Sequence, residues 1–316
     1  MATQTQTGKA FEYALINETY NILTLRGFII NLTIDSSYNT ALACYNVFNA
    51  RLQSRYSKAA ITAIEYIITL EPRLVTPQGS LDILTLQLQP DSAGANGDVR
   101  DLLFIRSNQN WEIGVSAKNN HTALKHSRLS NVKDFGNSWV GIPCSPSYFT
   151  AINQIFTKLS ALKSLGTAWK NVPNSHVDYY QPLLAAFVNE LTFINSNNAR
   201  VPQALISYLV GKHDFYKIIK KNKEVLVYAF NIHGTLGKSI NGTRSLSPVR
   251  KLALPTQIVQ FKMVPGLAGT LSMICDQGWQ ISFRIHSAET LVIPSLKFDV
   301  NLVGNPATMH TNHLAY

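Results

Sequence analysis

The chain has 316 residues, of which 46% are hydrophobic and only 15% are charged, with a formal net charge of +10. Disordered tails and coiled coils carry more charge and less apolar surface, so the composition excludes both and indicates a globular protein. At ~150 residues per domain, the length fits about two domains or one large one.

Two further features indicate where the protein works. No apolar run approaches the ~18 residues that span a bilayer, and the first residues lack the basic and apolar blocks of a secretory signal. The three cysteines, Cys44, Cys144 and Cys275, are too far apart to suggest a disulfide framework or a zinc ribbon. We therefore expect a cytoplasmic protein that makes no membrane contact.

The first half of the chain begins with helices and continues with strands. Apolar residues recur at helical spacing over about the first 70 residues, and this pattern ends at Glu71-Pro72. The segment 81–88 alternates between apolar and polar residues, as in a strand. Segments 99–106 and 111–118 are strand-like and are joined by a short polar turn, which predicts a hairpin.

The hairpin brings together groups that suit phosphodiester hydrolysis. Its first strand begins at Asp98 or Asp101, and its second ends by presenting Lys118 after an apolar run. A carboxylate can bind Mg²⁺, which polarises a phosphate, and a lysine can orient the attacking water and offset developing charge. The alternative is that Lys118 is merely a solvated strand end.

This layout resembles the restriction-endonuclease-like nucleases, whose signature is an aspartate, a hairpin, and then an acid, any residue and a lysine. Here the tripeptide is Ser116-Ala117-Lys118, so Ser116 occupies the place of the second acid. The resemblance implies a catalytic set of Asp101, Ser116 and Lys118, with Mg²⁺ bound by Asp101 and Asp98.

A second acid must then come from elsewhere if the site is active. Glu112 is excluded because six residues of strand cover ~20 Å. Gly8 to Glu12 looks like the opening helix of several such nucleases, which direct a helical glutamate at the metal, so Glu12 is our first candidate. Glu65 and Asp134 are alternatives, and Glu12 could equally be an ordinary exposed helix residue.

The segment after Lys118 is rich in basic residues. We expect a mostly helical chain from 119 to about 210, in which His121, Lys125 and Arg128 would form one basic face at positions i, i+4 and i+7. Such a face could contact phosphates beside the scissile bond. The alternative is a surface helix with scattered bases.

The last third of the chain is basic and rich in strands. Between 211 and 262 there are ten basic and two acidic residues, whereas the rest of the chain has 18 basic and 16 acidic ones. Strands are predicted at 225–232, 257–263, 270–275, 279–286 and 295–302, with a long mobile loop at 233–248. A local excess of +8 suits a polyanion such as DNA, although a solvated basic surface is the alternative. The DNA-binding candidates in this segment are Lys220, Lys221, Lys238, Arg244 and Arg250.

The last two predicted strands alternate most clearly. One face of each is apolar, and the other presents Arg284, His286 and Lys297. The Arg284 guanidinium could donate two hydrogen bonds to a guanine. A cross-strand pair between Arg284 and Asp299 is the structural alternative.

Several sequence blocks together carry a more specific resemblance over nearly the whole chain, to the HaeIII-like type II restriction endonucleases. The blocks are 116–136, 211–217 and 282–286. The resemblance implies Mg²⁺-dependent cleavage of double-stranded DNA at GGCC in a bacterial cytoplasm, with a cognate DNA methyltransferase that protects the host. A palindromic site also suits a homodimer.

The expected architecture is mixed α/β (α+β): a restriction-endonuclease-like core with a central mixed sheet flanked by helices, and a β-rich C-terminal extension. We expect residues 1–210 to form the catalytic core with helical insertions, and 211–316 to form a basic DNA-recognition region packed on it. Two other functions stay open at this point: a catalytically inactive DNA-binding module, because the second acid is missing from its usual place, and a nuclease for branched or damaged DNA.

Overall fold

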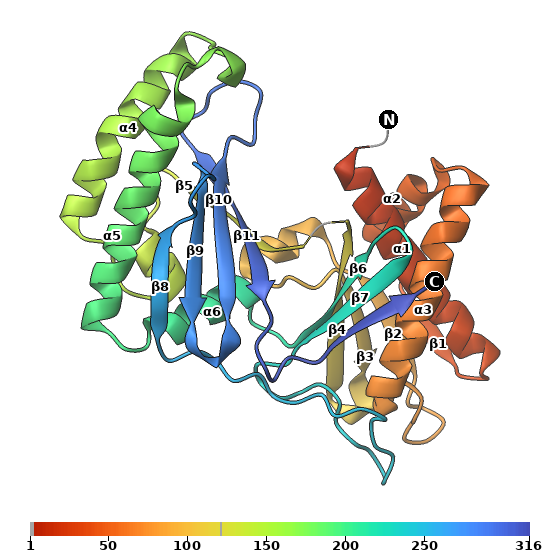
Figure 1. The fold of residues 1–316 in the computed structure, drawn as a ribbon. Helices are drawn as coiled ribbons and strands as arrows, with labels where there is room; N and C mark the ends of the chain where they lie inside the picture. Colours follow the sequence, from red (N-terminus) through yellow and green to blue (C-terminus); the bar gives the residue numbers. More distant parts are fainter. Residues whose placement is uncertain (1–2, 121) are drawn as a thin grey trace. The chain divides into compact units, whose positions relative to one another are not determined.

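The computed structural model describes residues 3–120 and 122–316, except for the side chains of 95 and 96. The chain forms two compact units, each built from separate segments (Figure 1). The first unit comprises Met1–Thr122, Gly211–Leu252 and Thr308–Tyr316, and the second comprises Ala123–Val210 and Ala253–Ala307. Each unit therefore combines segments from both of the contiguous parts that we expected, 1–210 and 211–316.

The first unit is a mixed sheet with helices against one face. Among the described residues the sheet has seven strands in the order β1-β2-β3-β4-β6-β7-β12. The strands are β1 (Ile30–Leu32), β2 (Leu84–Leu88), β3 (Leu102–Arg106), β4 (Trp111–Asn119), β6 (Phe215–Lys220), β7 (Glu224–Phe230) and β12 (Thr311–Ala315). The helices are α1 (Gln4–Leu25), α2 (Ser36–Asn46) and α3 (Ala50–Leu70).

The helices of the first unit begin and end at residues suited to those positions. Thr3 caps α1 by accepting a hydrogen bond from Gln6 N, and Gln6 Oε1 accepts one from Thr3 N, which is a capping box. Helix α3 ends before Pro72, as predicted, because proline cannot continue a helix. The buried residues of α1 and α3 share one core with those of β2, β3, β4 and β6.

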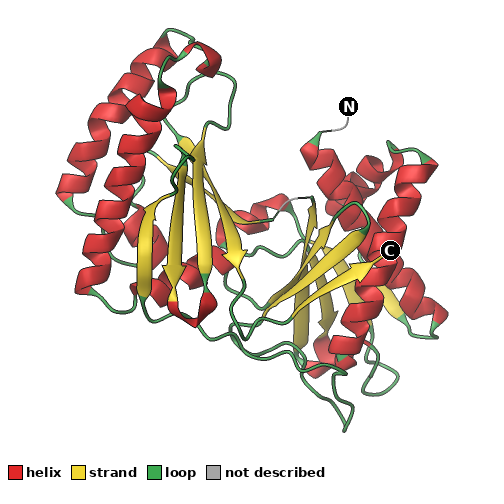
Figure 2. Cartoon of the chain, in the orientation of Figure 1, coloured by secondary structure: helices red, strands yellow, loops and turns green. Residues whose placement is uncertain are grey.

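The second unit is an antiparallel sheet with helices packed against one face (Figure 2). Its described strands have the order β5-β11-β10-β9-β8. They are β5 (Ala123–Leu129), β8 (Ile258–Met263), β9 (Thr270–Cys275), β10 (Gln280–His286) and β11 (Leu296–Gly304), and the helices are α4 (Pro146–Ser164), α5 (Gln181–Asn197) and α6 (Val201–Val210). Phe187 of α5 packs its ring against those of Phe261, Phe283 and Phe298, which places the core between α5 and the sheet.

The predicted mixed α/β architecture, consistent with a restriction-endonuclease-like fold, is confirmed. The predicted helix after residue 119 is wrong, because residues 123–129 form β5, which pairs antiparallel with β11. The strands β1, β6 and β12 were not predicted, and β1 lies within the first 70 residues, where only helices were expected. In the part of the chain that the structure describes, none of the helices has the length and apolar character needed to cross a membrane.

Candidate active site

Asp101 is held at the start of β3 by its own backbone. Its N–H donates to the Val115 carbonyl at 2.7 Å, and its carbonyl accepts from the N–H of Gln89 at 2.9 Å. Because Val115 belongs to β4 and Gln89 follows β2, both neighbouring segments fix the Asp101 backbone. The carboxylate therefore projects from a rigid part of the sheet.

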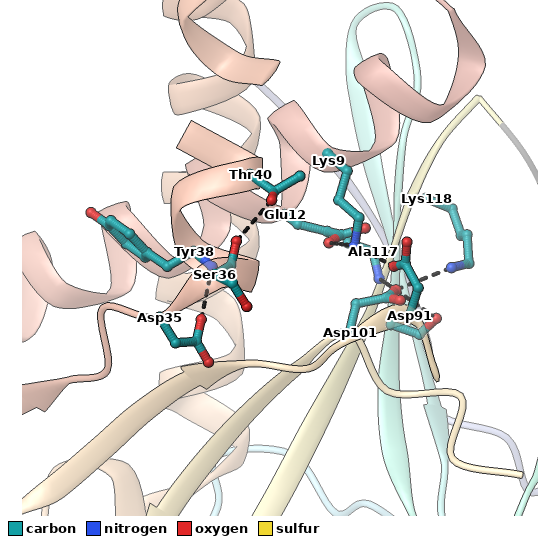
Figure 3. A network of polar contacts seen from close by, with 11 residues as sticks. Lys9, Glu12, Asp35, Ser36, Tyr38, Thr40, Asp91, Asp101, Ala117 and Lys118 are labelled. Atoms are coloured by element: carbon teal, nitrogen blue, oxygen red, sulfur yellow. Dashed lines mark hydrogen bonds and ion pairs between the residues drawn. The ribbon is translucent and has the colours of Figure 1, made fainter. Parts of the chain in front are cut away.

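Three donors from the end of β4 converge on one oxygen of Asp101. Oδ2 accepts from Ser116 Oγ at 3.2 Å. It also accepts from Ala117 N at 2.7 Å and from Lys118 Nζ at 3.0 Å (Figure 3). Among the described residues, no hydrogen bond reaches Oδ1. The structure thus brings Asp101, Ser116 and Lys118 together, and Oδ1 is the Asp101 oxygen left for a further ligand.

Glu12 lies on the buried side of α1, close to this group (Figure 3). Its Oε2 accepts a hydrogen bond from Lys9 Nζ at 2.9 Å, and the same ammonium lies 2.6 Å from Asp91 Oδ1. Burial and then the negative charge of Asp101 raise the pKa of Glu12 to about 7, although Lys9 and Lys118 oppose the shift. Glu12 is therefore not an ordinary exposed helix residue, because it is buried and its carboxylate is close enough to Asp101 to be affected by its charge. We refer to Glu12 and Asp101 as the acid pair.

The two alternative acids have other partners. Glu65 forms an ion pair with Arg26 near the surface of the first unit. Asp134 lies in the second unit, where Oδ1 accepts from the N–H groups of Asn137 and Cys144. Desolvation opposes it, but these hydrogen bonds hold the pKa of Asp134 below its ordinary value.

Asp98 forms an ion pair with Arg100. Its two oxygens accept from Arg100 Nε and Nη2 at 2.8 and 2.7 Å, and Oδ2 also accepts from Gln89 Nε2 at 2.8 Å. The Arg100 side chain lies against Gly114, where an added Cβ atom would be 2.1 Å from Arg100 Cδ. Arg100 Nη1 donates a hydrogen bond to Glu112 Oε1 at 2.5 Å. The contacts of Asp98 do not fit the metal-binding role that the sequence suggested.

The acid pair fits a hard divalent cation. Carboxylate oxygens are the protein ligands that Mg²⁺ prefers, and it needs only one or two of them beside water and substrate phosphate. Burial and the negative charge of Asp101 raise the pKa of Glu12, and a bound cation would oppose both effects. Among residues 3–120 and 122–316 no group of three or more His, Cys, Asp or Glu side chains could hold a metal.

Comparison with known proteins places this site in a family. A model of the HaeIII restriction endonuclease family matches residues 8–306. The chain is also 39% identical over 305 residues to the type II restriction enzyme HaeIII of Haemophilus aegyptius. The aligned residues cover 96% of this chain and 95% of that protein. The chain belongs to the HaeIII restriction endonuclease family. No solved structure matches it.

The matched region includes the segment in which a basic helix was predicted, and there the structure differs. Lys125 and Arg128 lie on β5, so they point to opposite faces of the sheet. Lys125 Nζ lies 3.6 Å from the centre of the Tyr208 ring and donates to the Tyr208 carbonyl, whereas Arg128 Nη2 lies 3.8 Å from Glu289. His121 is outside the described residues. The single basic face therefore does not form, because pairing with β11 imposes a strand.

The basic segment of the first unit contains both buried and exposed side chains. Lys220 is only 7% exposed, and its ammonium lies 5.0 Å from the centre of the Tyr56 ring, so it does not have the exposed position expected of a phosphate contact. Lys221 is half-buried at the turn between β6 and β7. Three candidates in the following loop are exposed: Lys238, Arg244 and Arg250.

That loop is held to the rest of the first unit at several points. Leu246 N donates to the Thr69 carbonyl, Gly237 N donates to Glu71 Oε1, and Leu252 N donates to the Asn231 carbonyl. The segment that carries Lys238, Arg244 and Arg250 is therefore attached to the rest of the first unit by hydrogen bonds.

On the polar face of the second sheet, Asp299 binds histidines. It lies opposite Arg284 in the register of β10 and β11, but its carboxylate contacts His126 Nδ1 at 2.6 Å and His286 Nε2 at 2.9 Å. Lys297 Nζ is 3.7 Å away. Arg284 is exposed and forms no ion pair with any described residue, so the predicted alternative of an Arg284 and Asp299 pair is not observed.

Three residues near the candidate active site were not predicted from the sequence. Lys9 and Asp91 complete the polar network of Glu12, and Lys217 of β6 lies beside β4. A lysine inside the apolar run Phe215-Tyr216-Lys217-Ile218-Ile219 was a usable signal, because lysine is almost never fully buried without a reason. Neither Asp91 nor the Asp299 histidines left a local sequence signal.

Proposed function

We propose that this protein is a type II restriction endonuclease that uses Mg²⁺ to cleave double-stranded DNA at GGCC. The observation that carries the proposal is the convergence of Ser116, Ala117 and Lys118 on Asp101, beside Glu12, in a chain of the HaeIII restriction endonuclease family. The signature places a second acid at the position that Ser116 occupies in this chain, and Glu12 of α1 supplies that acid instead.

The chain's own residues have distinct roles in the proposed reaction. Asp101 Oδ1 and Glu12 would hold the Mg²⁺, which supplies Lewis-acid polarisation of the phosphate and a bound water of lowered pKa. Ser116 and Ala117 fix the Asp101 carboxylate through Oδ2. Lys118, which is partly exposed, places an ammonium where the attacking water is oriented and where negative charge develops on the phosphate.

DNA recognition in this proposal uses two kinds of residue. The exposed Lys238, Arg244 and Arg250, with Lys221, contact phosphates and contribute sequence-independent affinity. On the second sheet, Arg284 is the base-reading candidate because a guanidinium pairs bidentately with guanine O6 and N7. The remaining basic candidates of that sheet are Arg128, His286 and Lys297.

The wider context follows from the target. A palindromic site matches a protein with twofold symmetry, so we propose a homodimer on DNA. A cell that contains such an enzyme must protect its own copies of the site, which requires a cognate DNA methyltransferase. The place of action is then the bacterial cytoplasm.

Incubation of the purified protein with plasmid DNA and Mg²⁺ tests the proposal. We expect discrete fragments whose ends map to GGCC and no cutting of plasmid in which that site is methylated. Discrete fragments with ends at another sequence would retain the endonuclease and refute the GGCC assignment. DNA binding without any cutting would favour the inactive DNA-binding module, and nicking confined to branched or damaged DNA would favour the structure-specific nuclease.

A further inference from the structure

Lys217 is a buried lysine on the strand next to the catalytic one. It is 3% exposed, and in the parallel pairing of β4 with β6 it lies in register with Ser116. Residues in register on neighbouring strands point to the same face, as do residues two apart on one strand. Lys217 therefore shares the sheet face of Ser116 and Lys118, opposite the face covered by α1 and α3.

The Lys217 ammonium binds the chain just after Lys118. Its Nζ donates to the carbonyl of Thr122 at 2.8 Å. An extended chain would carry Thr122 ~20 Å beyond Ser116, the register partner of Lys217, which is well outside the reach of a lysine side chain. The chain must therefore turn back over this face after β4, and Asn120 provides the turn with a positive φ of 57°.

A second contact fixes the same turn to β6. The N–H of Asn120 donates to the carbonyl of Lys220 at 2.8 Å. Among the described residues, the turn is thus attached through the backbone of Asn120 and through the contact of the Lys217 ammonium with Thr122. Because the turn begins two residues after Lys118, it determines where the last residues of β4 lie.

Stability alone does not favour a lysine at this position. Burial and the neighbouring Lys118 lower the pKa of Lys217 to about 7, and Asp101 only partly opposes them. An apolar side chain of similar length would avoid the desolvation cost, and replacing buried charged groups with apolar ones is often neutral or stabilising. The lysine is therefore better explained by what its donor holds in place than by stability.

We propose that Lys217 is a positioning residue that anchors the turn after β4 and so keeps the Lys118 ammonium on Asp101. This inference rests on the proposed nuclease function. It assigns no contact with DNA or metal to Lys217, so its removal changes the rate of cleavage and not the binding of the duplex.

The test compares Lys217→Met with Tyr216→Phe. Tyr216 is the adjacent buried residue of β6, it faces the helices, and its hydroxyl donates to Glu71, so Tyr216→Phe is a matched loss of one buried polar contact on the same strand. For Lys217→Met we expect single-turnover cleavage of a GGCC duplex in Mg²⁺ to fall by about tenfold or more, because small misplacements of a reacting group are costly. The affinity for the same duplex in Ca²⁺ should stay within about twofold, as expected when only the chemical step is affected.

Two readouts separate positioning from general structure. The Tm of Lys217→Met should equal or exceed that of the parent, and hydrogen exchange over 119–122 should become faster, whereas Tyr216→Phe should keep the parental rate and the parental exchange in that segment. An unchanged cleavage rate for Lys217→Met, or a Tm that falls together with the rate, would overturn the inference. Hydrogen exchange unchanged over 119–122 would overturn it as well.

A second variant covers a failure of Lys217→Met to fold. Lys217→Arg keeps a cationic donor for the Thr122 carbonyl, so we expect it to keep both the slow exchange of 119–122 and at least about a third of the parental rate. Slow exchange combined with a lost rate would contradict the positioning role. Absence of cleavage by the parent protein would instead refute the proposed function, which keeps the two failures distinguishable.

Discussion

The Lys118 ammonium lies 3.0 Å from Asp101 Oδ2, and the two side chains leave Asp101 Oδ1 without a hydrogen bond from any described residue. This arrangement makes separate demands on the two residues. In the proposed mechanism, Asp101 binds the metal and Lys118 lies beside the reacting phosphate.

The first prediction is that Asp101→Asn and Lys118→Met abolish cleavage without loss of DNA binding. Removing a group that stabilises the transition state costs ~3–4 kcal/mol, or about 10²–10³ in rate. The measurement is single-turnover cleavage in Mg²⁺, with duplex binding in Ca²⁺ as the control for folding. A variant that cuts within about tenfold of the parent would remove its residue from the catalytic set.

The second prediction concerns the acid from α1. Glu12→Gln keeps the size of the side chain but removes the charge of one metal ligand, so both cleavage and the metal-induced rise in Tm should be lost. Glu65→Gln and Asp134→Asn serve as controls, because their partners are Arg26 and backbone N–H groups. Thermal melts with and without Ca²⁺ measure the effect. Retention of the Ca²⁺ shift in Glu12→Gln together with its loss in Asp134→Asn would transfer the role to Asp134.

The catalytic strand and the last two strands of the second sheet were predictable from local pattern. Trp111 to Lys118 and Trp279 to His286 alternate between apolar and polar residues, and this period fixes which side chains share a face. Lys118 could be identified because it closes an otherwise apolar strand. The choice between Asp98 and Asp101 could not be made in this way, since both precede the same strand. The structure distinguishes them, because Arg100 binds Asp98 whereas the end of β4 binds Asp101.

The errors arose where distant segments decide the local structure. Lys125 and Arg128 have spacing that a helix would use, but β5 is stabilised by β11, which comes late in the chain. The sequence alone suggests that Lys220 is an exposed basic residue, but in the structure its ammonium lies beside the rings of Tyr56 and Tyr316. These partners lie far away in the sequence, so a local sequence pattern cannot reveal them. Contacts with such distant segments can override the local preference for a helix or a strand.

The third prediction is a pH dependence of stability centred on Glu71. Burial raises the pKa of Glu71 from 4.5 to about 7, although hydrogen bonds from Tyr216 and Gly237 oppose the shift. A carboxyl group with a raised folded-state pKa stabilises the protein fully below pH 4.5 and loses that contribution as the pH rises through about 7, since the folded state then binds more protons than the unfolded state. Glu71→Gln, which stays neutral, should therefore gain on the parent by roughly 2–3 kcal/mol between pH 4.5 and pH 8.

Urea unfolding at several pH values measures this difference, and Glu65→Gln is the control because the Glu65 side chain is partly exposed and paired with Arg26. The difference curve for Glu71→Gln should be flat below pH 4.5 and rise between there and about pH 7. A parallel pair of curves for Glu71→Gln and the parent would show that Glu71 does not titrate in this range.

The last prediction separates base reading from phosphate binding with two exposed arginines. Arg284 extends from the polar face of the second sheet while Asp299, its register partner, is held by His126 and His286. Arg250 is also exposed and belongs to the first unit. Because a bidentate base contact contributes ~1–3 kcal/mol of discrimination, Arg284→Ala should lose affinity for GGCC duplex about 5–150-fold while random duplex is bound almost as before. Arg250→Ala should weaken the binding of both duplexes alike and reduce the salt dependence of binding by about one unit, since it removes a single phosphate contact.

Binding of both duplexes in Ca²⁺ at two salt concentrations measures both effects. If Arg284→Ala lost the same affinity for the two duplexes, Arg284 would be a phosphate contact and another residue would have to read the bases.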